Sequence, residues 1–287
     1  MRNLSTLAWR VYDAPTEPWH GVVADTEGDD SVYVMRVERR DGVSQLTLAH
    51  ITPTGTEELA VLEVASAPPH VPDVADFRLL ADGGSSVNHM PAICVIGSGG
   101  DIVLMPVDEE ASAPAEVVGS VDQGILAAAW SPEEDVLVLI TGGEKRLIVM
   151  TREFEVMSET MLSTEAFGDD QPVNVGWGSK STQFHGSEGK QAAMAAANAP
   201  EESDPRGPLV PEDDGLPRIS WRGDGAFFVT SSAEASNDAV HRILRTYTRT
   251  GTLSATSDRS VRGISHVLAC RPTGNLIATT QRMGGPW

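Results

Sequence analysis

The sequence predicts an all-β protein with the architecture of a WD40-like β-propeller that is incomplete. Three observations lead to this fold class. Short apolar segments rich in Val, Ile, Leu and Thr recur along the 287 residues, turn-forming residues separate them, and one strand–turn–strand unit repeats at spacings near 50 residues. Such segments are typical of antiparallel strands joined by tight turns, and a period near 50 is typical of propeller blades.

The individual strands are predicted from apolar runs bounded by Gly, Pro, Asp or Asn. The sequence 41–42 is Asp-Gly, 53–55 is Pro-Thr-Gly and 98–100 is Ser-Gly-Gly, and each favours a turn between two strands. A helix is expected only at 188–199, where alanines dominate. The expected strands are 31–37, 45–51, 58–64, 92–96, 102–107, 135–140, 146–151, 226–230, 243–247 and 276–280.

The repeated unit is a strand that ends on a large or apolar residue, a short turn, and a second apolar strand. It is visible at Trp130, Trp221 and Cys270, with a weaker copy at Phe77. These four residues lie 53, 91 and 49 positions apart. A blade of four strands occupies about 50 residues, so the 91-residue step predicts one blade plus an insertion of about 40 residues.

The insertion is expected at about 177–217. It begins with a glycine-rich loop, continues through the alanine-rich helix, and ends in a segment rich in proline and acidic residues. This last part is expected to be disordered, because it has too little apolar surface to bury. About four blades and the start of a fifth then fit within 1–287, so the domain over these residues is predicted to be a truncated propeller.

Composition excludes several functions. The chain has 41 acidic and 21 basic side chains and a formal charge of -20, which argues against direct binding to a nucleic-acid backbone. Two cysteines are too few for a disulfide scaffold or a zinc cluster, and neither a signal peptide nor a membrane span is visible. We expect an intracellular protein without catalytic residues, cofactor or metal, since the seven histidines have no ligand spacing and the acidic pairs are expected to be solvated.

One loop stands out as a candidate partner contact. Glycines flank Trp177 on both sides, which allows the backbone to approach another surface closely, and Lys and aromatic residues follow. An ordered loop that caps a neighbouring blade is the equally weighted alternative, whereas Trp130 and Trp221 are expected to pack between blades. The candidate contact residues are Trp177, Lys180, Gln183, Phe184, Gly186 and Lys190.

These residues also carry a family resemblance. The tract 175–186, Val-Gly-Trp-Gly-Ser-Lys-Ser-Thr-Gln-Phe-His-Gly, resembles the hallmark of the largest subunit of the Elongator complex, the IKAP family. The segments 119–125, 219–224 and 271–278 are similar in the same order. The resemblance covers most of the chain from about residue 77. The glycine–tryptophan–glycine tract is specific, whereas the blade repeats fit any WD40-like protein.

The resemblance implies a non-catalytic scaffold required for modification of the tRNA wobble uridine at carbon 5. Another Elongator subunit would perform the chemistry. The implied partners are the other Elongator subunits, with tRNA bound by the whole complex and not directly by this chain. The parent protein would form a homodimer through regions that this chain lacks, and it would reside in the cytoplasm, with the nucleus as a second compartment.

Two other functions remain open from the residues alone. A generic WD40-type interaction module of another intracellular complex would show the same repeats. A β-propeller hydrolase would need polar or metal-ligating residues at the blade starts, and no repeated Asp or His occurs there.

Overall fold

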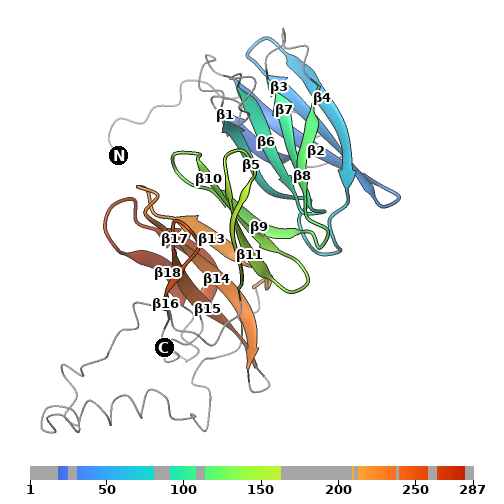
Figure 1. Ribbon diagram of the computed structural model, residues 1–287. Helices are drawn as coiled ribbons and strands as arrows, with labels where there is room; N and C mark the ends of the chain where they lie inside the picture. Colours follow the sequence, from blue (N-terminus) through green and yellow to red (C-terminus); the bar gives the residue numbers. More distant parts are fainter. Residues whose placement is uncertain are drawn as a thin grey trace, which may run out of the picture. The chain divides into compact units, whose positions relative to one another are not determined.

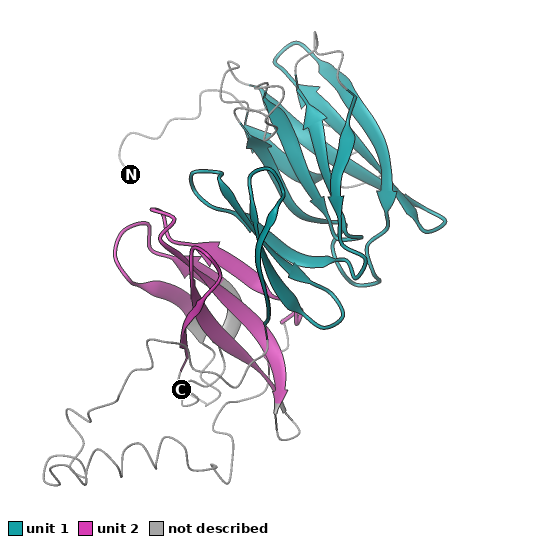
Figure 2. Ribbon diagram, in the orientation of Figure 1, with its two compact units in different colours: residues 1–162 teal, residues 163–287 magenta. Residues whose placement is uncertain are grey.

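The computed structural model describes residues 19–24, 31–80, 91–107, 114–162, 209, 213–236, 239–257 and 264–281. The chain divides into two compact units, residues 1–162 and 163–287 (Figure 2). Within the described residues all regular structure is β-strand, in agreement with the predicted fold class.

The first unit contains three four-stranded antiparallel sheets, each a simple meander (Figure 1). Neighbouring strands in each sheet are consecutive in the chain. The first strands of the sheets lie beside one another, β1 against β5 and β5 against β9, as the inner strands of propeller blades do. The first sheet is β1 (Trp19–Ala24), β2 (Val32–Arg40), β3 (Val43–Ile51) and β4 (Thr56–Ala65); the second is β5 (Val74–Leu80), β6 (Ala92–Gly97), β7 (Asp101–Pro106) and β8 (Glu116–Ser120); the third is β9 (Ile125–Trp130), β10 (Val136–Thr141), β11 (Arg146–Thr151) and β12 (Val156–Met161).

The second unit contains one further meander and a pair of strands. Both are antiparallel, and β17 lies against β13, the first strand of the meander. The described residues therefore form four complete four-stranded sheets and two strands of a fifth, as the repeat spacing predicts. The strands are β13 (Arg218–Trp221), β14 (Phe227–Ser236), β15 (Ala239–Thr248) and β16 (Leu253–Thr256), followed by β17 (Ile264–Cys270) and β18 (Ile277–Gln281).

The core of the first unit lies between its sheets. Side chains alternate across a strand, so Ile93 and Val95 of β6 pack toward the first sheet, whereas Cys94 and Ile96 pack toward the third. Both faces of β6 are covered in this way, and all six of its residues are buried. Burying one such aliphatic side chain contributes about 1.5–3 kcal/mol. Trp130 belongs to the core between the second and third sheets, which confirms its predicted packing role.

Glycines allow the linkers between sheets to lie against hairpin turns. A Cβ atom on Gly99 would stand 1.9 Å from the Ala65 carbonyl oxygen, so only glycine allows this approach. The amide of Ser98 in the same turn donates to the Asp73 carbonyl at 2.8 Å, and the amide of Ile125 donates to the Ser98 carbonyl at 3.1 Å. The hairpin turn between β6 and β7 is thereby fixed to the linkers on either side of its sheet.

The predicted repeats correspond to real structural equivalents. Trp130, Trp221 and Cys270 each end the first strand of a sheet. The amide of the next residue donates to the carbonyl of the first residue of the following strand after Trp130 and Trp221, and to the carbonyl of the residue just before that strand after Cys270. The weaker copy of the repeat, at Phe77, is three residues out of step with the others. Its strand β5 continues to Leu80, and Leu80 is the residue that packs in the core. Among the described residues no helix has the length and apolar character needed to cross a membrane. The expected helix at 188–199 lies outside the described residues.

Candidate partner-contact site

The contact residues predicted from the sequence lie outside the described part of the chain. This applies to Trp177, Lys180, Gln183, Phe184, Gly186 and Lys190 alike, so their role stays a prediction. The structure does describe Leu209 and the segment 213–217, which form the C-terminal end of the expected insertion.

The end of the insertion is held by Arg242 of β15. The Arg242 guanidinium donates from Nε to Asp213 Oδ2 at 2.6 Å and from Nη2 to Asp213 Oδ1 at 2.5 Å. Its Nη2 also donates to the Leu216 carbonyl at 2.9 Å. A bidentate pair fixes distance and orientation together, so segment 213–217 has a defined position on the β13–β16 sheet.

This arrangement corrects two expectations from the sequence. The side chains of Asp213 and Arg242 are both fully buried, whereas Asp213 was expected to be solvated. The last residues of the acidic segment are placed by this pair, although the segment was expected to be disordered throughout. The physical reason is that a buried arginine requires an acidic partner, and Asp213 supplies it.

The neighbouring Asp214 forms a similar but exposed pair with Arg218. Partial burial alone would raise the pKa of Asp214, but hydrogen bonds from Arg218 and from the Leu216 amide, with the charges of Arg218 and Arg242, hold it below its ordinary value. The Asp214 side chain is 43% exposed, and solvent screens such a pair. Of the two adjacent acids, Asp213 is therefore the one that fixes segment 213–217 to the sheet, and it is called the anchor below.

A second charge pair joins β14 and β15. Glu234 Oε1 accepts from Arg245 Nη1 and from the Ser232 hydroxyl at 3.0 Å, and Glu234 Oε2 accepts from Arg245 Nη2 at 3.1 Å. Burial raises the pKa of the nearby Tyr247 to about 12, and its ring stacks on Phe228 with centroids 5.3 Å apart. Arg242 and Arg245 are three residues apart and therefore project from opposite faces of β15.

These arginines were not predicted as site residues, although the sequence carries a signal for them. Arg245 lies within the predicted strand 243–247 and Arg242 immediately precedes it, and arginines placed inside a sheet require acidic partners. Which acids supply them depends on tertiary contacts that span 11 residues for Glu234 and 29 for Asp213.

The buried thiol of Cys94 is suited to packing in the core and not to a reaction. Burial raises the pKa of the Cys94 thiol well above its ordinary value, and the nearby Asp76 carboxyl raises it further. A thiol in this state is a poor nucleophile. Among the described residues, no three His, Cys, Asp or Glu side chains are placed to hold a metal ion. In the β13–β16 sheet, the two buried arginines Arg242 and Arg245 are paired with acids.

Comparison with known proteins establishes the family. The ELP1 first N-terminal beta-propeller family matches residues 1–285, which is nearly the whole chain. The chain belongs to this family. The same fold follows from the strand order described above, in which each complete sheet is a four-stranded meander.

Relatives of the ELP1 family with this similarity occur in animals and fungi. Elongator complex protein 1 of Mus musculus is 40% identical over 98% of this chain and 19% of its own length. Elongator complex protein 1 of Schizosaccharomyces pombe is 37% identical over 66% of this chain and 15% of its own length, and that of Saccharomyces cerevisiae is 33% identical over 64% and 15%. The chain therefore spans about a fifth of the length of the mouse relative.

Proposed function

We propose that this chain is the first propeller of a non-catalytic scaffold subunit of the Elongator complex. In this role it presents loops and sheet edges to other subunits and so supports modification of the tRNA wobble uridine at carbon 5. The observation that carries the proposal is the match of residues 1–285 to the ELP1 first N-terminal beta-propeller family.

The described geometry supports a presenting role. Within the first unit, meander sheets with fully buried strands such as β6 and β10 make a closely packed frame. The two buried arginines of the β13–β16 sheet are held in the pairs Arg242–Asp213 and Arg245–Glu234. The net charge of -20 favours contact with proteins over contact with phosphate groups, so tRNA is bound by the complex through other parts.

The test uses the full-length parent protein with Trp177→Ala combined with Phe184→Ala. We expect reduced co-purification of other Elongator subunits, or reduced carboxymethyl-type uridine measured by mass spectrometry of tRNA nucleosides. Val156→Ala combined with Met157→Ala is the control, since these side chains are exposed on β12. Unchanged assembly together with unchanged modification would exclude a role for the predicted loop.

A deletion strain tests the proposed function separately from the loop. Loss of the parent protein should abolish carboxymethyl-type wobble uridines, whereas a module of an unrelated complex would leave them at the wild-type level. Imaging the tagged parent tests the proposed location, the cytoplasm with the nucleus as a second compartment.

A further inference from the structure

The outermost strand of the first sheet differs from the other outer strands in length. The β4 edge, Thr56–Ala65, has 10 residues, whereas β8 has 5, β12 has 6 and β16 has 4. It is the last strand of its sheet, so alternate residues direct their N–H and C=O groups away from β3. Propellers usually leave only short outer edges, because a long free edge can pair with another strand.

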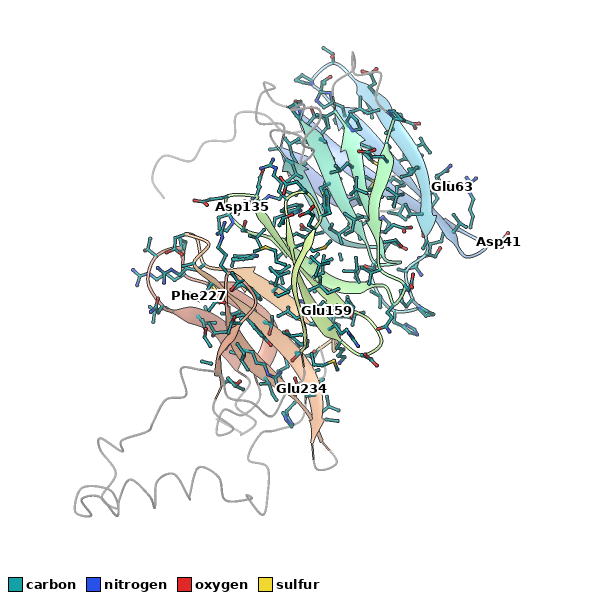
Figure 3. All side chains as sticks on the ribbon, viewed as in Figure 1. Asp41, Glu63, Asp135, Glu159, Phe227 and Glu234 are labelled. Atoms are coloured by element: carbon teal, nitrogen blue, oxygen red, sulfur yellow. The ribbon has the colours of Figure 1, made fainter. Side chains whose placement is uncertain are left out.

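The side chains of the β4 edge are acidic and apolar. Glu57, Glu58 and Glu63 are exposed, Val61 is 50% exposed, and the strand contains no Lys or Arg. Figure 3 shows Glu63 at the outer margin of the sheet. Arg36 Nη2 approaches Glu58 Oε1 at 3.9 Å, and no ion pair to Glu57 or Glu63 occurs among the described residues.

The register places one apolar and two acidic side chains of β4 on the same face of the sheet. Glu58 is opposite Ala49, Val61 opposite Thr47 and Glu63 opposite Gln45, with an irregularity between 58 and 60. Because Ala49, Thr47 and Gln45 alternate along β3, their three partners share one face of the sheet. The C-terminal end of the edge is fixed, since the Ala65 amide donates to Asp101 Oδ2 at 2.8 Å.

We propose that the β4 edge binds an extended, cationic segment of a partner protein as an added strand. Backbone hydrogen bonds to β4 would supply affinity, and Lys or Arg at alternate positions would face the glutamates. A second copy is disfavoured, because pairing two β4 strands brings glutamates together. Nucleic acid is disfavoured by the same negative charge. The inference does not depend on membership in the Elongator complex.

The test measures binding of a fluorescent decapeptide of alternating lysine and valine to the full 287-residue chain. We expect saturable binding, weakened about tenfold or more by Glu58→Lys combined with Glu63→Lys, since like charges then face the peptide from the same side of the edge. Glu116→Lys on the short β8 is the matched control and should leave the affinity unchanged. Circular dichroism confirms that the variants are folded.

Two further measurements distinguish strand addition from nonspecific charge attraction and from dimerisation. N-methylation of every second peptide residue removes ladder donors without changing charge, and it should abolish binding. Equal binding of the methylated peptide, or equal weakening by Glu116→Lys, would reduce the effect to nonspecific charge attraction and overturn the proposal. Sedimentation showing a dimer that Glu63→Lys dissociates would assign the edge to a second copy and also overturn it.

Discussion

At the residue scale, the Arg242–Asp213 pair is expected to be the most sensitive charge interaction of the second unit. Arg242→Ala leaves a fully buried carboxylate without its partner, which costs about 3–5 kcal/mol in the free energy of unfolding. Urea unfolding and hydrogen exchange of the β15 amides measure the loss. Arg218→Ala, which removes the exposed partner of Asp214, should cost at most about 1 kcal/mol. Equal costs for the two variants would contradict the assignment of Asp213 as the anchor.

The Asp76 carboxyl predicts a pH dependence of stability. Burial raises its pKa from 3.8 to about 6, opposed by a hydrogen bond from the Phe77 amide and by the charge of Arg78. The folded state then binds more protons than the unfolded state between these values, so this group's contribution to stability falls as pH rises from about 4 to 6. Asp76→Asn should match the wild type at pH 4 and be more stable by about 1–3 kcal/mol at pH 7.5. Urea midpoints across this range measure the difference, and parallel curves would contradict the prediction.

At the element scale, the contacts between hairpin turns and linkers are expected to set the spacing of the sheets. Gly99→Ala places a Cβ atom 1.9 Å from the Ala65 carbonyl oxygen, so the turn or the end of β4 must shift, at a cost of about 1–3 kcal/mol. Gly55→Ala is the matched control because no atom lies within 4 Å of its new Cβ. Thermal unfolding compares the two, and the prediction is wrong if Gly55→Ala is the more destabilising.

Among the strands, burial decides which ones could be predicted from the sequence. Strands buried on both faces, such as β6 and β10, consist of uninterrupted apolar residues and were predicted within one or two positions. The outer strands β8, β12 and β16 were missed because their exposed or half-buried positions tolerate polar residues such as Glu, Ser and Thr, which removes the apolar signal. The buried partners of Arg242 and Arg245 were missed because residues distant in sequence supply them. The candidate loop around Trp177 stays a prediction.

At the scale of the whole molecule, the charge of -20 predicts that the isolated chain does not bind tRNA. Binding to phosphates depends on cations that release counterions, and this chain has 21 basic residues against 41 acidic ones. Several arginines are also neutralised internally, among them Arg242, Arg245 and Arg78. We therefore expect a Kd for tRNA weaker than about 100 μM at physiological salt, which is the weak limit of nonspecific binding. Filter binding at 50 and 150 mM salt measures it. A micromolar Kd that weakens steeply with salt would mean that the remaining cations form a tRNA-binding surface, and it would contradict the prediction.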